Sequence, residues 1–382
     1  MSASKLIRES RNRARRRRLR YQPSFSLLAH RIPSVECTRS KPAGCGPVVP
    51  AVCCEETAEY LALVQSEPHE PDNSSRSDNG PKPRCRHREI IPGETYLLTK
   101  KCLCDLFLIR PSKEINAALR YLLALKAKRY RLKVHHFCMM SNHFHLLVTD
   151  PEGRIPDFMR EFLHESSKAI QAVLGERLRI WDPERYGHVR LLDLDAKIRL
   201  GVYTELNPLI ASQTLPEEWP GLTSARYGRD TVIRAERPNF YFSKRRPEVV
   251  ELELVPFDPS AEDGLDAAEI EALYRETYDA TEAELLDTFA KRNVELAGVD
   301  DVLAQPRTRR GSHTLSELNP RYATRNPELM NQAVEGTRQF ESDFEAARKR
   351  WLAGHRRAVF PHATYGYRVT LGVRVAARGT AA

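Results

Sequence analysis

The pattern of apolar and polar positions changes near residue 90 of this 382-residue chain. Residues 66–87 are rich in proline, serine, asparagine and charge, and they offer almost nothing to bury. We therefore expect residues 1–90 to form a disordered leader, with one short helix over residues 55–65 as the single element that its pattern allows.

Strand and helix patterns alternate after the leader. Residues 95–99 read as a strand, and residues 106–109 as its extension after a turn or bulge. Ser112 is a good helix N-cap, and the apolar positions behind it recur at helical spacing: Ile115, Leu119, Leu122 and Leu123. A first helix is therefore expected to begin at Ser112.

A hairpin and a second helix are predicted next. Residues 132–140 and 143–148 read as two strands joined by a short link, and residues 155–174 as a helix that ends at Gly175. The order β-α-β-β-α is most of a ferredoxin-like split βαβ unit, an antiparallel sheet with both helices on one face. The predicted fold class is therefore α+β.

The predicted domains are the leader, the ferredoxin-like domain over residues 91–225, and an extension of unknown role over residues 226–382. The extension carries a strand pattern near residues 249–254 and helical patterns over residues 267–293 and 337–354. We expect this C-terminal extension to be mainly helical.

Charge is concentrated in the leader. The first 20 residues hold nine basic side chains against Glu9 and carry +8 of the net charge of +9. They include Arg15, Arg16, Arg17 and Arg18. Arginine suits phosphate oxygens, so this arm is a candidate contact for nucleic acid, the alternatives being a solubilising tail or a misassigned start.

The chain shows no signature of membrane insertion or export. It has no run of 18 apolar residues, no secretory signal and no CxxC pair among its eight cysteines. We expect a protein that spans no membrane, with reduced cysteines, located in the cytoplasm and associated with the nucleoid.

Further basic residues gather at the end of the first helix. Lys128, Arg129 and Arg131, with Arg110, Lys126 and Lys133 nearby, are either the wall of a DNA groove or a solvated helix cap. Three more follow Pro306, namely Arg307, Arg309 and Arg310, and we interpret them as a solvated loop.

The candidate chemistry lies in the second strand of the hairpin. His143 and His145 are two residues apart, so both imidazoles point to one face of the sheet while Phe144 points to the core on the other. Two such imidazoles can reach one divalent ion, which could polarise a scissile phosphate. Of His135 and His136 in the preceding strand, only one can face the same side, and we expect them at the surface.

The segment from Met140 to Val148, MSNHFHLLV, resembles the His-hydrophobe-His (HUH) signature of REP-associated tyrosine transposases and related insertion-sequence transposases. Ser141 stands where that family has proline. Three further blocks resemble the family in order and rough spacing: Trp181 to Tyr186, Tyr203 to Pro208, and Trp219 to Ser224. The resemblance covers residues 94–225.

The resemblance implies a nuclease that cleaves one DNA strand with a tyrosine, which lies one helical turn before a polar metal ligand on the helix after the HUH strand. Residues 160–171 contain no tyrosine, and Ser166 or Ser167 stands at the expected place. His164 is the nearby candidate base, and the resemblance makes Gln171 a candidate third ligand beside His143 and His145. Either a serine replaces the tyrosine, or Tyr186 or Tyr203 moves in, or cleavage is lost.

Two functions therefore stay open at this point. The first is a metal-dependent HUH transposase that uses Mg or Mn to cleave and rejoin single-stranded or hairpin DNA. The second is a catalytically altered or inactive, domesticated DNA-binding protein; a structural domain with incidental histidines is a weaker third. A homodimer is a candidate assembly for the first two.

Overall fold

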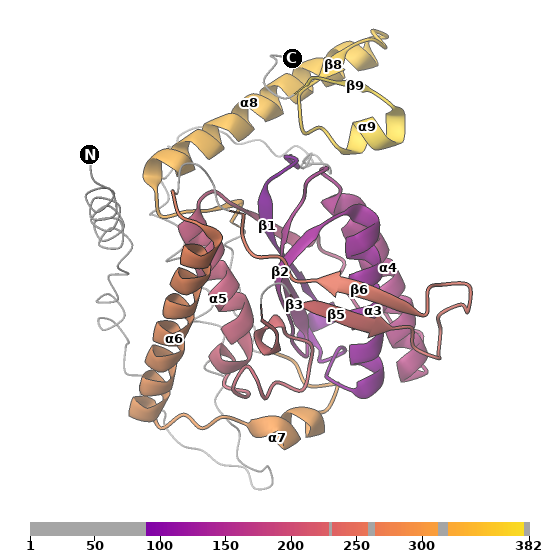
Figure 1. Ribbon diagram of the computed structural model, residues 1–382. Coiled ribbons are helices and arrows are strands. Elements are labelled where there is room, and N and C mark those ends of the chain that lie inside the picture. The colour runs from indigo at the N-terminus through magenta and orange to yellow at the C-terminus, as the bar shows by residue number, and fades with distance from the viewer. Residues whose placement is uncertain (1–88, 229–230, 259–263, 312–319, 378–382) are drawn as a thin grey trace, which may run out of the picture. The chain divides into compact units, whose positions relative to one another are not determined.

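The computed structural model describes residues 89–228, 231–258, 264–311 and 320–377 (Figure 1). All of them belong to one structural unit, residues 51–382. The expectations for Arg15, Arg16, Arg17 and Arg18 and for a helix over residues 55–65 lie outside the described residues.

A five-stranded sheet carries the fold, with the strand order β2-β3-β1-β4-β7. Its antiparallel part consists of β1 (Thr95–Lys101), β2 (Lys133–Met139), β3 (His143–Thr149) and β4 (Gly187–Leu191). The short β7 (Tyr322–Ala323) adds to β4 in parallel. The order of the first four strands is that of a ferredoxin-like split βαβ unit, so the predicted α+β fold class is confirmed.

Both predicted helices lie on one face of the sheet. In α3 (Lys113–Tyr130), the Ser112 hydroxyl caps the first turn by accepting from the Ile115 amide at 3.2 Å. α4 (Ile155–Leu174) ends at Gly175, whose φ of +70° is the left-handed conformation that glycine adopts without strain. The caps predicted for these helices are therefore confirmed.

A third long helix, α5 (Leu194–Ile210), covers the opposite face of the sheet, and α6 (Ala267–Arg292) lies beside it (Figure 1). Leu97 and Leu147 of the sheet pack with α5 in one core, whereas their neighbours Leu98 and Leu146 pack with α3 and α4 in the other. A sheet buried on both faces needs apolar residues at successive strand positions, as these pairs provide.

The predicted strand extension over residues 106–109 is wrong. A short 3-10 helix, η2 (Leu103–Asp105), follows β1 directly, and Cys104 and Asp105 have positive φ values of 52° and 53°. Two left-handed residues end the extended path. Leu106 instead makes an isolated antiparallel bridge to Arg310, far along the chain.

The C-terminal extension combines helices with small sheets. β5 (Val232–Glu236) and β6 (Val249–Glu253) form a hairpin against α3. The remaining elements are α7 (Gly298–Ala304), α8 (Pro327–Leu352), β8 (Val359–Phe360), α9 (Gly366–Leu371) and β9 (Arg374–Val375). The helix predicted from residue 337 begins ten residues earlier, where Asn326 caps it. The proposed division at residues 225 and 226 stays a prediction.

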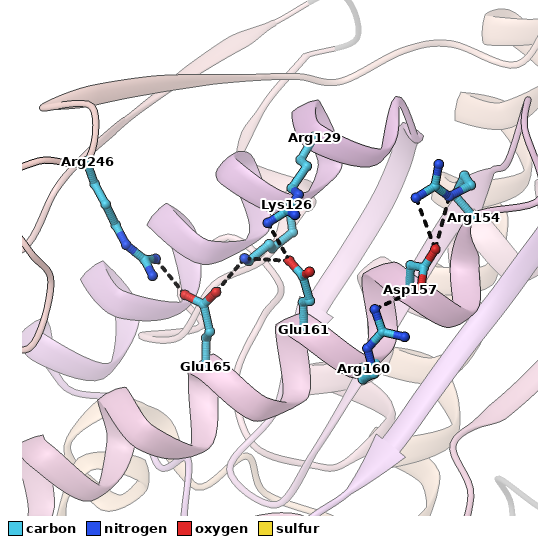
Figure 2. A network of polar contacts seen from close by, with 8 residues as sticks. All are labelled: Lys126, Arg129, Arg154, Asp157, Arg160, Glu161, Glu165 and Arg246. Carbon is cyan, nitrogen blue, oxygen red and sulfur yellow. Dashed lines mark hydrogen bonds and ion pairs between the residues drawn. The ribbon is translucent and has the colours of Figure 1, made fainter. Parts of the chain in front are cut away.

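Ion pairs join α3, α4 and the β5–β6 hairpin loop (Figure 2). Lys126 is buried and bonds to both Glu161 and Glu165 of α4, and Arg246 of the loop reaches Glu165 from the other side. A buried ammonium must be paired in this way. The expectation that Lys126 lines a DNA groove or a solvated cap is therefore wrong.

His135 and His136 are both buried, not at the surface as expected. A β-bulge between Val134 and His136 breaks the regular alternation of β2, so both imidazoles contact the ring of Phe257. The Nδ1 atom of His135 donates to the Val255 carbonyl at 2.7 Å, and its Nε2 lies 2.8 Å from the Thr149 hydroxyl.

The free energy of unfolding is expected to decrease as the pH falls below 6.5, because His135 is buried in its neutral form. Burial lowers the pKa of His135 from 6.5 to about 3, so below pH 6.5 the unfolded chain binds a proton that the folded chain excludes. The stability from the neutral imidazole is complete above pH 6.5 and is lost as the pH falls toward 3; about 2 kcal/mol is gone at pH 5. Urea unfolding at pH 7 and pH 5 should show a pH dependence smaller by that amount in His135→Gln, and an equal pH dependence in both proteins would contradict the assignment.

None of the described helices is long and apolar enough to cross a lipid bilayer. The described cysteines, Cys102, Cys104 and Cys138, are free thiols.

Candidate active site

His143 and His145 lie side by side on the α5 face of the sheet. Their ring centroids are 4.9 Å apart, as expected for alternate residues of a strand. Phe144 between them faces the other way and packs edge-on against Phe162 and Trp181. The shared face of the two imidazoles and the inward-pointing phenylalanine were both predictable from strand periodicity.

α5 brings a tyrosine and an asparagine to the two histidines. The ring of Tyr203 lies 5.2 Å from that of His145, nearly perpendicular to it, and the side chain of Asn207 hydrogen-bonds His143. Tyr203 and Asn207 are four residues apart, so they share one face of the helix. We call these four residues the His143–Tyr203 site.

The two imidazoles differ in their hydrogen bonds. The Nδ1 atom of His143 lies 2.7 Å from Oδ1 of Asn142, so this nitrogen donates and Nε2 keeps its lone pair. Both ring nitrogens of His145 are buried, and neither has a hydrogen-bond partner among the described residues. A buried polar atom without a partner costs free energy, so the two ring nitrogens of His145 indicate a place for a ligand.

Burial keeps both histidines neutral near pH 7. Burial, reinforced by the charge of Lys101, lowers the pKa of His143 to about 4. Burial and the neighbouring His143 lower the pKa of His145 well below its usual value. Neutral imidazoles offer the lone pairs that metal coordination requires.

A buried hydrogen-bond network fixes the rotation of α5. Glu205, between Tyr203 and Asn207 in sequence, accepts from the hydroxyls of Tyr274 at 2.6 Å and Ser224 at 2.7 Å. Its carboxylate also lies 3.0 Å from Nδ1 of His136. With Glu205 held toward β2 and α6, the opposite side of this turn of α5 presents Tyr203 to the histidine pair.

Gly201 lets α5 approach β2 at this place. A Cβ atom there would lie 2.9 Å from Nε2 of His136 and 3.0 Å from the ring of Tyr274. Such contacts would push the helix away from the sheet, so the glycine contributes to the position of Tyr203 one half-turn further on.

The structure does not bring the predicted residues of α4 to the histidines, because α4 packs on the opposite face of the sheet. Ser166 is buried there and accepts from the indole N–H of Trp181 at 3.0 Å, while Ser167 is half-buried on the same helix. His164 is exposed, and the amide of Gln171 donates to the Leu178 carbonyl at 2.6 Å.

Tyr186 and the predicted DNA-binding residues of α3 also lie away from the site. Tyr186 packs with the core of α3 and α4. Lys128, Arg129 and Arg131 lie where α3 passes into β2, next to the Thr149 end of β3 and so at the opposite end from His143. Arg129 and Arg131 are paired with Glu161 and Glu152.

Within the described ranges, no group of three or more histidine, cysteine or carboxylate side chains is placed to hold a metal ion. The donors that the His143–Tyr203 site offers are two imidazoles and the amide of Asn207, a mixture that includes an oxygen donor.

Residues 110–188 match the family of IS200-like transposases. The matched residues include β3 with His143 and His145, and they end before α5. The family resemblance predicted from the sequence is therefore confirmed for this segment, and a role in DNA transposition is the class of function that the match supports.

Two solved structures are similar to part of the chain. A REP-associated tyrosine transposase bound to a REP hairpin is 19% identical, with a TM-score of 0.30, over 37% of this chain and 82% of that one. A protein assigned as a transposase from Deinococcus radiodurans R1 is 18% identical, with a TM-score of 0.22, over 28% and 84%. No curated protein sequence matches the chain. At TM-scores this low, the classification rests on the family match.

Proposed function

We propose that this protein is a metal-dependent transposase that cleaves and rejoins single-stranded or hairpin DNA, with Tyr203 as its nucleophile. One observation carries the proposal: Tyr203 and Asn207 of α5 contact His145 and His143 of β3, respectively. A tyrosine one helical turn before a polar ligand, facing an HUH pair, is the arrangement that the family resemblance implies. Tyr203, one of the alternatives that the sequence left open, takes this role in place of Ser166 or Ser167.

The residues at the site fit a divalent metal. His143 and His145 would hold it through imidazole nitrogens, and Asn207 through its amide oxygen in place of Gln171. The support is the unpartnered ring nitrogens of His145 and the neutral state of both imidazoles. A bound Mg or Mn ion would supply Lewis-acid polarisation of the scissile phosphate.

The chemistry of the chain's own residues follows from this placement. The Tyr203 phenol loses its proton, its oxygen forms a bond to phosphorus, and the bond from phosphorus to the leaving sugar oxygen breaks. The leaving oxygen takes up a proton, and the strand stays attached as a phosphotyrosine. Attack by a sugar hydroxyl on that phosphotyrosine reverses the steps and rejoins DNA.

The alternative function, a DNA-binding protein without strand cleavage, rested on the absence of a tyrosine from α4. Tyr203 lies at the histidine pair on a different helix, so this reason no longer holds. A homodimer and a location at the nucleoid stay predictions.

Metal binding is expected to depend on the histidine pair and not on α4. Isothermal titration of the full chain with Mn²⁺ should give one site, which His145→Ala weakens by at least about 10-fold to 100-fold because an imidazole ligand is lost. Tyr203→Phe should keep the affinity. His164→Ala, a substitution of an exposed histidine on α4, is the matched control.

Equal Mn²⁺ affinity in the wild type and His145→Ala would contradict the proposed ligands. A loss of Mn²⁺ affinity in His164→Ala would instead indicate that the metal site includes residues of α4.

A further inference from the structure

Residues 305–311 of the C-terminal extension return to the segment that borders the His143–Tyr203 site. The Phe107 amide donates to the Arg309 carbonyl at 3.1 Å, and the Gly311 amide donates to the Asp105 carbonyl at 3.0 Å. The bridge between Leu106 and Arg310 lies between these bonds. The segment is therefore fixed in place by backbone contacts.

These residues reach His143 through a single intervening side chain. A Cβ atom on Gly311 would lie 2.5 Å from Nδ2 of Asn142, and Oδ1 of the same side chain accepts from His143. The backbone of Asn142 also accepts from the Cys102 amide at 2.6 Å. Gly311, Asn142 and His143 thus form a continuous row at the start of β3.

The surface beside this row carries more positive than negative charge. Arg309 and Arg310 are exposed, and neither has an acidic partner among the described residues. Arg309 lies over the ring of Phe107, with its guanidinium 5.7 Å from the ring centroid. Of the acids nearby, Asp105 is already paired with Lys101 at 3.6 Å.

Two further arginines, Arg110 and Arg307, are close enough for the charge of one to act on the other. Arg110 donates to the Gln305 carbonyl at 2.6 Å, and the Nε atoms of Arg110 and Arg307 are buried without a described hydrogen-bond partner. Burial and then the charge of Arg110 lower the pKa of Arg307, against an opposing effect of Glu176. Two guanidinium groups that repel each other are stabilised by an anion.

We propose that residues 305–311 bind the phosphate backbone of a single DNA strand and lead it to the His143–Tyr203 site. Guanidinium groups match phosphate oxygens in shape and charge, and surfaces that bind single strands combine a positively charged groove with aromatic side chains. The proposal rests on the proposed function for the choice of DNA as ligand. It assigns a role to part of the extension and replaces the interpretation of Arg307, Arg309 and Arg310 as a solvated loop.

The test compares two double variants of the full chain that lose the same charge. Arg309→Ala/Arg310→Ala changes the proposed surface, and Arg338→Ala/Arg350→Ala removes two exposed arginines from α8. Fluorescence anisotropy with fluorescein-labelled oligodeoxythymidine of about 20 nucleotides measures the affinity at several salt concentrations, in EDTA, so that neither metal nor cleavage contributes.

The first variant should bind roughly tenfold more weakly, and the slope of log affinity against log salt should fall by about 1.4, the value for two lost contacts to single-strand phosphates. The α8 variant should keep the wild-type affinity and slope. Circular dichroism of both variants checks that the fold is retained.

The outcomes separate this proposal from the proposed function. Equal binding by the wild type and the first variant, with the wild type still forming a covalent DNA adduct, overturns only the role of residues 305–311. If the first variant binds DNA more weakly than the wild type, but the wild type forms no covalent adduct, the result supports this proposal and overturns the proposed cleavage. A wild type that binds no DNA overturns both.

Discussion

Tyr203→Phe is expected to abolish strand cleavage, with the rate of covalent adduct formation on a labelled DNA hairpin falling by a factor on the order of 10³ or more. The substitution removes only the phenolic oxygen, which is the proposed nucleophile. The ring packing against His145 is kept, so the fold and the Mn²⁺ affinity should stay near those of the wild type. Denaturing gel electrophoresis of protein incubated with the hairpin and Mn²⁺ measures the adduct.

Three matched substitutions make this result specific. Tyr186→Phe removes a phenolic oxygen elsewhere in the domain, and Ser166→Ala and Ser167→Ala remove the hydroxyls that stand at the tyrosine position expected on α4. All three should form the adduct within a fewfold of the wild-type rate, because these side chains lie with the core of α3 and α4. An adduct that persists in Tyr203→Phe and disappears in Ser166→Ala or Ser167→Ala would refute the role of Tyr203.

Glu205→Ala is expected to have the largest effect on stability, lowering the free energy of unfolding by about 3–5 kcal/mol. Glu205 is buried and is the shared hydrogen-bond partner of His136, Tyr274 and Ser224. Its removal leaves several buried polar groups without that acceptor and opens a cavity between α5, β2 and α6. Urea unfolding measures the change.

Two controls separate this network from a general effect of lost charge. Glu276→Ala removes an exposed carboxylate from α6 and should change stability by less than about 0.5 kcal/mol. Tyr274→Phe removes one of the hydrogen bonds to Glu205 and should cost about 1 kcal/mol. If Glu205→Ala costs no more than Glu276→Ala, the network does not hold α5 in place.

Local signals predicted the elements that run from β1 to α4. Ser112 and Gly175 mark helix ends through their own backbone and side-chain chemistry, so sequence alone locates them. The left-handed residues Cys104 and Asp105 carry no such signal, because neither residue type requires a positive φ. The predicted strand extension failed at this point.

The histidine face was predictable and its partner helix was not. Alternation in β3 placed His143 and His145 on one face, but it could not say which helix covers that face. The position of α4 directly after β3 favours it as the partner from sequence alone, although a split βαβ unit puts this helix on the other side of the sheet. The adjacent leucines Leu146 and Leu147 were the signal of a sheet covered on both faces.

Tyr203 and Asn207 themselves were visible in the sequence as a tyrosine followed four residues later by an asparagine. Their place beside His143 and His145 depends on α5 packing against this face of β3 with the correct rotation about its axis. Long-range contacts with His136 and Tyr274 set that rotation, and no local pattern encodes them. The role that we propose for residues 305–311 could not be predicted from the sequence for the same reason.

Mapping the residue that carries DNA tests the central claim most directly. Trypsin cleavage after Arg199 and Arg226 yields one peptide with Tyr203, and cleavage after Arg160 and Lys168 yields another with Ser166 and Ser167. After reaction with a DNA hairpin and Mn²⁺, nuclease and trypsin digestion, mass spectrometry should find the nucleotide mass on Tyr203 in the first peptide. A nucleotide on Ser166 or Ser167, or on neither peptide under conditions in which the protein binds the hairpin, would contradict it.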